Sequence, residues 1–513
     1  MWKTIRSARK KQEEGCMIER NHHRNSTLLI DRRDLLKALG LGVTSIALPG
    51  YMSGRGCFAG EPSTDKPNII FIMADDLGYG DLSCYGATKV KTPNINRMAK
   101  EGVRFTDAHS PSAVCSPTRY GVLTGRYCWR TRLKQWVCPP NDPLLIEKDR
   151  LTVASLLKSA GYTTGCVGKW HLGFGEERPD WNRQLKPGPL EVGFDYYFGV
   201  PTSHNWAPYV YVENHHVVGR RENEFIEVDD NGTEKQGIAA KRNSEEIALI
   251  QTGKVIEFIQ CNKDKPFFLY FATCNVHKPY TPNDRFKGTS QCGIYGDFIH
   301  EFDWTVGEVL NTLDRLRLYD KTLIIVTSDN GANDEFRKFG HSSCGFLRGQ
   351  KTDIWEGGHR VPFVARWPGK IKAGTTSDEV ICLTDFMATS AAVVGAELPN
   401  NAGEDSYNIL PILLGQKADR RIREATVHHS ISGVFSIRQG PWKLILGRGS
   451  GGWSKPHYVK PKPGEPEGQL YNLKKDPTET DNVWSRHPEI VKRLAKLLEK
   501  YKKESHSRPL KGC

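Results

Sequence analysis

Several features are missing from this sequence, and each absence excludes a class of protein. No apolar run approaches the roughly 20 residues that a membrane-spanning helix needs, so the chain is not expected to be an integral membrane protein. No Cys-x-x-Cys pair occurs among the 13 cysteines, which argues against a zinc ribbon or a thioredoxin-type site. The sequence also has no internal repeat. What remains is a chain of 513 residues with enough hydrophobic residues to bury a core.

The net charge of +13 is concentrated at the two ends of the chain. Residues 1–60 contain 11 basic and 5 acidic residues, and residues 489–513 contain 8 and 3, which leaves only +2 for the residues between them. A nucleic-acid-binding protein would carry a basic stripe on its folded body. We therefore expect no nucleic-acid partner.

Residues 1–62 are predicted to be an export signal. Arg32 and Arg33 resemble a twin-arginine motif and precede a short apolar stretch over residues 38–49. The alternative is an amphipathic helix with a chance pair of arginines. Cys57 follows a weak lipoprotein box, so lipid anchoring is not expected, and Met17 offers a second start. The sequence thus predicts a periplasmic or extracellular protein.

The cysteines are scattered through the chain. In an oxidising compartment Cys128 and Cys138 could close a small loop. Cys166 and Cys382 lie in apolar runs and are expected to be buried.

The order of the predicted elements indicates an α/β fold over residues 63–415. Apolar, β-branched runs without polar alternation indicate strands that are buried on both faces, as in a large, mostly parallel sheet between helices. Such runs occupy residues 68–74, 163–168, 267–273 and 322–327. Helical patterns occupy residues 93–100, 151–159 and the region of 299–313.

Residues 416–513 are predicted to form a small α+β subdomain. Residues 434–439, 442–446 and 469–473 are typical of antiparallel strands. A helix beginning at Pro488 would place a row of apolar residues on one face.

Polar side chains follow four of the predicted strands, where ligands bind in open α/β sheets. They are Asp75 and Asp76, Lys169 and His171, His277, and Asp329 and Asn330. The three carboxylates and one amide supply only oxygen ligands, which suits Ca²⁺ or Mg²⁺. Each acidic pair could instead cap a helix or turn. Asp385, close to a helix start, is interpreted as such a cap.

The segment Cys115-Ser116-Pro117-Thr118-Arg119 is a further candidate site. Pro117 fits the first turn of a helix, which would place Cys115 at a helix N-terminus, where backbone N–H groups favour anions. From the residues alone, Cys115 could be a thiolate nucleophile of lowered pKa, part of an anion site, or an inert buried cysteine.

These motifs together resemble the type I sulfatase family of the alkaline-phosphatase-like superfamily. The resemblance rests on Cys115 to Arg119 with a downstream Thr-Gly-Arg, on ADDLGYGD from Ala74, GKWHLG from Gly168 and TSDNG from Thr327, and it extends from about Pro67 to the C-terminus. The segment 193–204 and Trp355 to Gly358 are most similar to arylsulfatase A and N-acetylgalactosamine-6-sulfatase. The resemblance implies that a maturation enzyme converts Cys115 to formylglycine, whose hydrate attacks sulfur.

The resemblance also implies a role for each candidate residue. One Ca²⁺ per chain, with Mg²⁺ as the less favoured ion, would be held by Asp75, Asp76, Asp329, Asn330 and the modified Cys115. Arg119 would hold the nucleophile, Lys169 and Lys351 would bind sulfate oxygens, and His171 would be the base that releases sulfate. The residues expected to contact the leaving group or the sulfate ester are His277, Lys351 and Ser203.

The sequence thus predicts an exported sulfuric ester hydrolase acting on a sulfated carbohydrate or an aryl sulfate. A phosphonate or phosphate ester hydrolase of the same superfamily is one alternative, and an inactive protein that binds sulfated glycans is another. Aromatic residues after Ser203 and around Trp453 could contact a sugar ring or could be packing residues.

Overall fold

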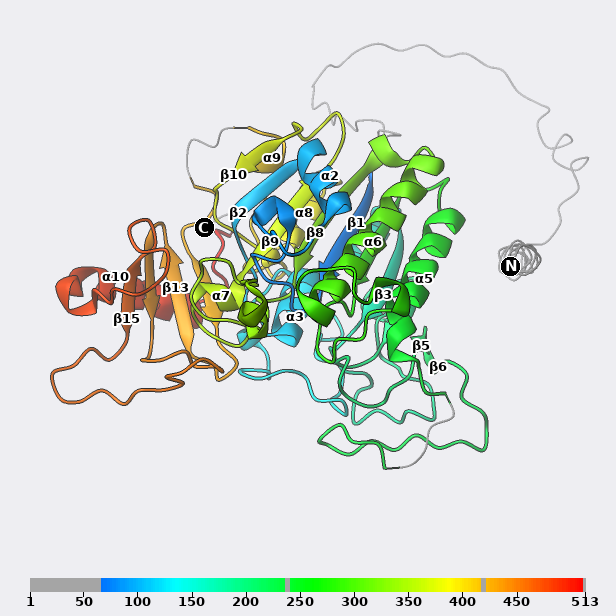
Figure 1. Ribbon diagram of the computed structural model, residues 1–513, viewed down its shortest axis with the longest axis horizontal. Helices are drawn as coiled ribbons and strands as arrows, with labels where there is room; N and C mark the ends of the chain where they lie inside the picture. Colours follow the sequence, from blue (N-terminus) through cyan, green and yellow to red (C-terminus); the bar gives the residue numbers. More distant parts are fainter. Residues whose placement is uncertain (1–65, 236–239, 417–420, 511–513) are drawn as a thin grey trace, which may run out of the picture. The chain divides into compact units, whose positions relative to one another are not determined.

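The computed structural model describes residues 66–235, 240–416 and 421–510 (Figure 1). The predicted export signal and the cysteine of the weak lipoprotein box therefore lie outside the described residues. Within these three ranges, no helix has both the length and the apolar character that crossing a membrane requires.

An 11-stranded sheet forms the body of the fold. Its order is β10-β2-β9-β8-β1-β7-β3-β4-β5-β6, and β11 pairs with β2. The strands are β1 (Asn68–Ala74), β2 (Val103–His109), β3 (Thr163–Lys169), β4 (Tyr196–Val200), β5 (Val212–Glu213), β6 (His216–Val217), β7 (Phe267–Ala272), β8 (Thr322–Ser328), β9 (Arg360–Arg366), β10 (Thr375–Ser377) and β11 (Ile381–Cys382). The predicted mostly parallel sheet is confirmed. Strand β9 is the exception in the body of the sheet, since it runs antiparallel to both β2 and β8.

Helices cover both faces of this sheet because its central strands are apolar on both faces. In β1, Ile70 and Ile72 pack against one helical layer, and Ile69 and Phe71 pack against the other. The first layer contains α2 (Pro93–Glu101), α5 (Ile247–Cys261) and α6 (Gly293–Arg315). The second contains α3 (Cys115–Thr124), α4 (Val153–Ser159) and α8 (Phe386–Val393). The large sheet lies between these two layers.

Local sequence signals set several of the element boundaries. Helix α4 begins after Thr152, whose Oγ1 accepts a hydrogen bond from the Ser155 backbone N–H at 3.1 Å. Asp385 caps the short turn before α8, because it accepts a hydrogen bond from the Cys382 backbone N–H at 2.9 Å in a capping box. Its side chain makes no capping hydrogen bond to α8 itself and pairs with the buried Arg423. The predicted helices and strands of this region are therefore present, with shifts of one or two residues for most of them.

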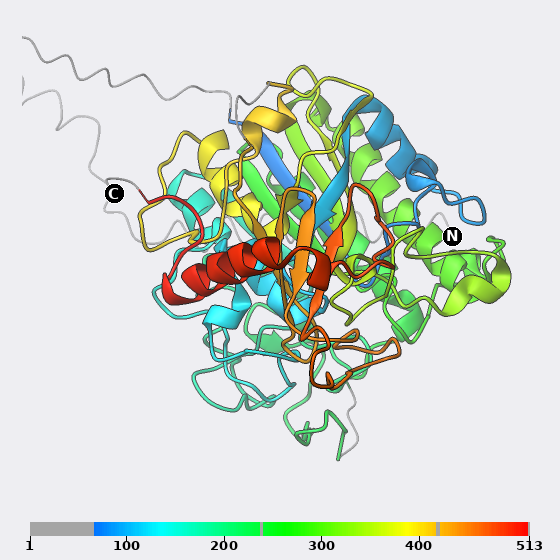
Figure 2. The ribbon, with the colours of Figure 1, turned by 90° about the vertical axis from the view of Figure 1, so that its left-hand side faces the viewer.

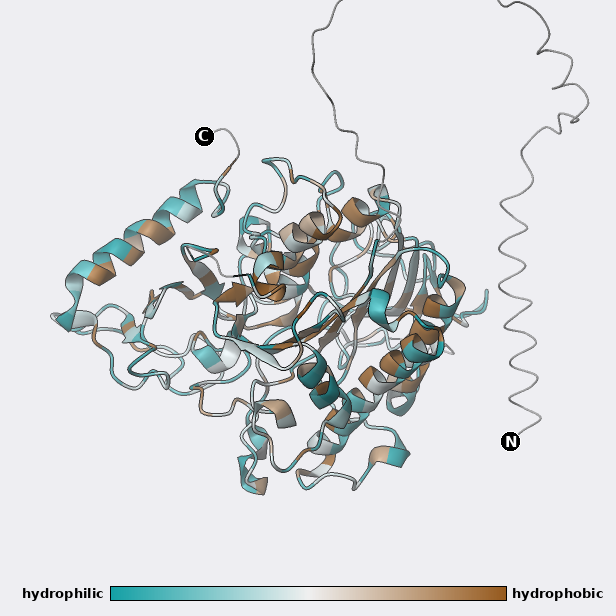
Figure 3. Ribbon diagram, turned by 90° about the horizontal axis from the view of Figure 1, so that it is seen from above, coloured by the Kyte–Doolittle hydropathy of each residue, from teal (hydrophilic) through white to brown (hydrophobic). Residues whose placement is uncertain are grey.

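A second, antiparallel sheet follows in the sequence, as predicted. Its strands pair in the order β12 (Thr426–His429), β13 (Phe435–Gln439), β14 (Trp442–Ile445) and β15 (Gln469–Asn472). Helix α10 (Pro488–Lys503) crosses this sheet (Figure 2). Its Leu494 and Leu498 belong to the same buried hydrophobic cluster as Ile437 and Leu444 of the sheet. Figure 3 shows the corresponding amphipathic character, since hydrophobic residues recur along an otherwise hydrophilic α10. Two short helices, α7 (Glu356–His359) and α9 (Leu410–Leu413), complete the fold.

The possible link between Cys128 and Cys138 is not formed in this structure. Both residues are buried free thiols. The Sγ atom of Cys128 contacts Thr131 and Leu133, whereas that of Cys138 contacts Asp142. The two sulfur atoms therefore have different surroundings and form no loop.

Candidate active site

The ends of the central strands bring the sequence-predicted polar residues together. Asp75 and Asp76 follow β1, Lys169 ends β3, and Asp329 follows β8. Backbone hydrogen bonds hold these ends side by side, because Asp75 N–H donates to Asn275 O at 2.7 Å and Asp329 N–H donates to Ala74 O at 3.1 Å. The carboxyl ends of β1, β3, β7 and β8 therefore form one edge at which the site is assembled.

Four oxygen-bearing side chains converge at this edge. Asp75, Asp329 and Cys115 each place a potential ligand atom within 4.8 Å of the other two. Asn330 donates from Nδ2 to Asp76 Oδ1 at 2.8 Å, while its buried Oδ1 has no hydrogen-bond partner in the described part of the chain. An unpartnered buried oxygen beside three carboxylates fits a hard divalent cation.

Three basic side chains balance the three carboxylates. Lys169 Nζ lies 2.8 Å from Asp75 Oδ2, and Lys351 Nζ lies 2.6 Å from Asp76 Oδ2. Arg119 Nη2 lies 2.6 Å from an oxygen of Asp329. All six side chains are nearly or completely buried, so these pairs are shielded from water. Lys351 comes from a loop, yet it reaches the same point as the residues at the strand ends.

The pKa values of the carboxyls follow from these contacts. Burial disfavours the charged form of Asp75, but Lys169, His277 and Arg119 outweigh it and hold the pKa of Asp75 well below its usual range. Burial and the neighbouring Asp75 raise the pKa of Asp329 to about 7. Burial in a neutral site thus disfavours the charged form of Asp329, which a bound cation would favour.

Cys115 is the first residue of α3, as the sequence predicts. Its side chain is only 3% exposed and packs with Val114, Val137 and Ile431. Burial raises the pKa of the Cys115 thiol, despite the nearby Lys169 and Lys351. Of the alternatives for Cys115, a thiolate of lowered pKa is therefore not supported, because desolvation outweighs the two lysines.

Both candidate histidines lie at the site and are neutral. Burial, together with Lys169 and Arg119, holds the pKa of His171 well below its usual range, and neither ring nitrogen has a hydrogen-bond partner among the described residues. Burial and Lys351 lower the pKa of His277 to about 4. The Nε2 atom of His277 lies 3.4 Å from Ser203 Oγ and 3.6 Å from Asp76 Oδ2. The structure thus brings together every site residue that the sequence predicts.

Three residues at the site have a positive φ. Seven non-glycine residues of the described chain have positive φ, and three of them are Asp76 (65°), His171 (56°) and Thr352 (80°). Thr352 is β-branched, for which this conformation is costly. Its N–H donates to Ala113 O at 2.8 Å, and its O accepts from Ile431 N at 3.0 Å. Thr352 was not predicted as a site residue, because no motif includes it and its position next to Lys351 is the only signal in the sequence.

Two tryptophans flank the polar centre. The ring of Trp206 meets that of His171 edge to face, with centroids 5.9 Å apart. Lys351 Nζ lies 5.9 Å from the ring centroid of Trp453, which is 46% exposed. The backbone N–H of Trp453 donates to Thr352 Oγ1 at 3.0 Å. This hydrogen bond holds the C-terminal loop that carries Trp453 next to Lys351.

Comparisons with known proteins agree with this geometry. The chain matches the sequence model of the sulfatase family over residues 67–396 and a model described as N-sulphoglucosamine sulphohydrolase, C-terminal, over residues 349–504. N-acetylgalactosamine-6-O-sulfatase of Bacteroides thetaiotaomicron is 40% identical over 505 residues, covering 89% of this chain and 98% of that protein. Human arylsulfatase A is 32% identical over 465 residues, covering 86% and 88%.

A solved structure from work on glycosaminoglycan metabolism by Bacteroides thetaiotaomicron shares the fold. It superposes with a TM-score of 0.79 at 40% sequence identity, over 86% of this chain and 100% of that one. The similarity therefore extends over the large sheet and the C-terminal sheet together.

Proposed function

The chain belongs to the sulfatase family and is a sulfuric ester hydrolase, and we propose that its nucleophile is a formylglycine made from Cys115. The observation that carries this proposal is the position of Cys115, buried at the start of α3 within 4.8 Å of Asp75 and Asp329. The hydrate of the aldehyde supplies one hydroxyl that attacks sulfur and a second whose deprotonation releases sulfate.

We further propose that the cation is Ca²⁺. Asp75, Asp76, Asp329 and Asn330 offer only oxygen ligands, with the modified residue 115 completing the set, and Ca²⁺ accepts such sets with flexible geometry. Bound there, the ion supplies Lewis-acid polarisation and lowers the pKa of the attacking hydroxyl. Mg²⁺ is the less favoured ion, because it demands a stricter octahedral geometry.

The basic residues would neutralise negative charge during the reaction, and the histidines would transfer protons. With three carboxylates and three basic groups, a site with one divalent cation carries +2, which complements a sulfate monoester and an ionised attacking oxygen. Lys169 and Lys351 would bind sulfate oxygens and Arg119 would hold the nucleophile. His171 is neutral, and its ring nitrogens have no hydrogen-bond partner among the described residues, so it can accept the proton whose loss releases sulfate.

His277, Lys351 and Ser203 would contact the leaving alcohol or the sulfate ester. The negative charge of a bound sulfate ester raises the pKa of His277 from its value of about 4, so that Nε2 can carry a proton to the leaving oxygen. Ser203 Oγ, 3.4 Å from that nitrogen, would contact the sulfate ester.

The proposed substrate is a sulfated amino sugar, with 6-O-sulfated N-acetylgalactosamine as the first choice. It is supported by the name of the 40% identical relative and by the exposed ring of Trp453 beside Lys351. The proposal includes export through the Arg32-Arg33 signal and a maturation enzyme as partner. It also treats residues 63–415 as the catalytic domain and 416–513 as a C-terminal subdomain.

The test is sulfate release by protein produced in a host that makes formylglycine. The panel contains N-acetylgalactosamine 6-sulfate, its 4-sulfate isomer, an aryl sulfate and a phosphonate monoester. We expect the 6-sulfate to have the highest kcat/KM. Preference for the phosphonate would favour the alternative esterase, and binding of sulfated sugars without turnover by formylglycine-containing protein would favour the inactive glycan binder.

Replacement of Trp453 tests the proposed sugar contact. In Trp453→Ala we expect KM for the sulfated sugar to rise about fivefold, because stacking on an aromatic face contributes about 1 kcal/mol. The aryl sulfate, which has no pyranose ring, should keep its KM within about twofold, and Trp453→Phe should recover most of the loss. An equal rise for both substrates would show that Trp453 acts only by holding Lys351.

A further inference from the structure

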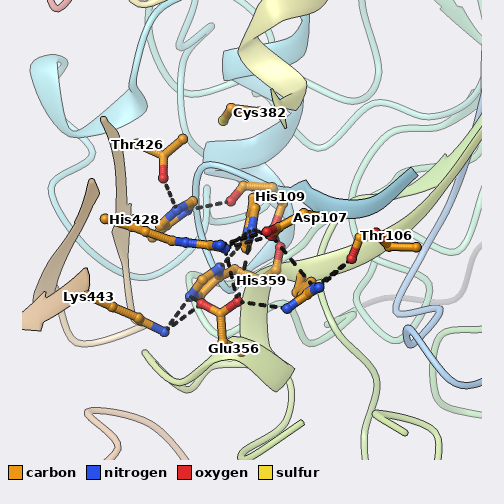
Figure 4. Close-up of polar contacts among 12 residues, drawn as sticks. Thr106, Asp107, His109, Glu356, His359, Cys382, Thr426, His428 and Lys443 are labelled. Carbon is orange, nitrogen blue, oxygen red and sulfur yellow. Dashed lines mark hydrogen bonds and ion pairs between the residues drawn. The ribbon is translucent and has the colours of Figure 1, made fainter. Parts of the chain in front are cut away.

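A second buried polar cluster lies between the large sheet and the C-terminal sheet (Figure 4). We call His109, His359 and His428 the histidine cluster. They come from β2, α7 and β12, and all three are completely buried. Each offers a nitrogen within 4.8 Å of the others, a spacing that would admit a metal ion.

The ring geometry excludes a metal ion at the histidine cluster. A metal binds in the plane of an imidazole ring, but the rings of His359 and His428 are stacked, with centroids 4.0 Å apart and planes 9° apart. Both nitrogens of His428 are already engaged, Nδ1 with Ser110 O at 2.9 Å and Nε2 with Thr426 Oγ1 at 2.9 Å. No nitrogen of His428 is left for a ligand bond.

The neighbouring acidic group also has no room for a cation. Asp107, His109 and Glu356 approach one another closely, but the Arg438 guanidinium lies among them. Its Nη1 is 2.6 Å from Asp107 Oδ1 and 3.5 Å from Glu356 Oε2. Arg438 itself supplies the positive charge there.

The charged groups around the histidine cluster balance one another. The acidic members are Asp107, Glu356 and Glu479, and the basic members are Arg360, Arg438 and Lys443. Burial lowers the pKa of all three histidines, so they are neutral. The cluster is therefore a neutral, hydrogen-bonded core that joins the two sheets rather than a site for an ion.

His428 connects the histidine cluster to the segment that precedes Cys115, through a hydrogen bond to Ser110. A carbonyl oxygen can only accept, so Nδ1 of His428 carries the proton and donates to Ser110 O, while Nε2 accepts from the Thr426 hydroxyl. Ser110 in turn donates from its N–H to His359 O at 2.8 Å and from its Oγ to Ser112 O at 2.7 Å.

The segment after Ser110 is held on its other side by β12 and Thr352. Ala113 N–H donates to His429 O at 3.1 Å, and Ala113 O accepts from Thr352 N–H at 2.8 Å. Cys115 follows two residues later as the first residue of α3. The position of Cys115 relative to Asp75 and Asp329 therefore depends on contacts made by the C-terminal sheet.

We propose that His428 is a positioning residue for the nucleophile, acting through the carbonyl of Ser110. This inference rests on the proposed function of Cys115, and it makes the C-terminal sheet part of the catalytic apparatus. The chemical reason is that a displacement of about 1 Å at a reacting atom can cost about a hundredfold in rate without changing substrate binding.

The test compares Asn and Gln at position 428. The amide nitrogen of Asn can occupy the place of His Nδ1, whereas that of Gln reaches the place of Nε2. We expect His428→Asn to keep kcat within about threefold and His428→Gln and His428→Phe to lose about ten- to hundredfold, with KM within about twofold in all three. Formylglycine content, measured by peptide mass spectrometry, is used to normalise each kcat.

Leu494→Ala in α10 is the matched control, because it weakens the packing of the same sheet without touching Ser110. It should lower the melting temperature and leave kcat unchanged. Equal kcat for the Asn and Gln variants, or a loss of kcat in Leu494→Ala as large as in His428→Gln, would overturn the proposal.

Amide hydrogen exchange over residues 110–118 gives a readout that does not need activity. Exchange there should be faster in His428→Gln than in His428→Asn. If the unaltered protein hydrolyses no sulfate ester, the proposed function fails while the exchange difference still decides the role of His428. If the Gln and Phe variants do not fold, Thr426→Val replaces them in this test, because it removes the hydroxyl that donates to His428 Nε2. Exchange over residues 110–118 should then be faster in Thr426→Val than in the unaltered protein. Unchanged exchange would overturn the proposal.

Discussion

Cys115→Ala is expected to abolish turnover, with kcat at least about 10⁴-fold below that of the unaltered protein. The reason is that alanine cannot become an aldehyde hydrate, and no other nucleophile is proposed at this edge of the sheet. Cys115→Ser should instead release one equivalent of alcohol and then stop as a sulfated enzyme. A serine hydroxyl can attack sulfur, but it lacks the second hydroxyl whose deprotonation would release sulfate.

Mass spectrometry separates these outcomes. The unaltered protein should lose about 18 Da at Cys115 through conversion to the aldehyde, and Cys115→Ser incubated with substrate should gain about 80 Da as a sulfate ester. Cys128→Ala is the control, because Cys128 is another buried free thiol outside the site. Full activity of protein whose Cys115 is unmodified would refute the proposed nucleophile.

Removal of the cation is expected to abolish activity while the fold survives. Three carboxylates face three basic groups, so the metal-free site is already neutral, and we expect the melting temperature to fall by only a few degrees. Lys169 and Lys351 are then held by Asp75 and Asp76 and are not free to bind sulfate. Treatment with a chelator should therefore reduce kcat/KM by more than about a hundredfold, and Ca²⁺ should restore it more fully than Mg²⁺.

Two variants test whether the loss of activity on cation removal comes from the proposed ligands. Asp75→Asn should weaken Ca²⁺ binding, measured by calorimetry, and should not be rescued by Ca²⁺ at concentrations that saturate the unaltered protein. Asp81→Asn is the control, since Asp81 is equally buried but is bound by His341 and Tyr295. Chelator-treated protein that keeps its activity, or Asp75→Asn with unchanged Ca²⁺ affinity, would show that these residues do not hold the ion.

The sequence predicted several buried strands of the large sheet but missed β2 and β9. Strands β1, β7 and β8 have apolar centres and were identified to within one residue, as was β3, whose run also contains threonine and glycine. Strands β2 and β9 were not, because VRFTDAH and RVPFVAR mix charged residues and a proline into the run. Their burial in the sheet depends on tertiary partners such as Glu101, which pairs with Arg366, and Asp107, which pairs with Arg438.

The candidate site was predictable to the extent that its residues follow strands or lie in family motifs. Parallel strands bring their ends to one edge, so the meeting of Asp75, Lys169 and Asp329 follows from topology. The environment of Cys115 did not follow, because its exposure depends on Val137 and Ile431 from distant segments. The histidine cluster was also missed, since its members lie far apart in the sequence and no local pattern links them.

The central place of β1 determines when the site can form during folding. Asp76 N–H and Asp329 Oδ1 meet across 253 positions of the sequence, and closing so long a loop costs chain entropy before any contact compensates it. Helix α3 is local in the sequence, whereas the contact between Asp76 and Asp329 needs β8 in place. In the folded protein Cys115 is only 3% exposed. The modification that we propose for Cys115 would therefore need to reach its thiol before the sheet is complete.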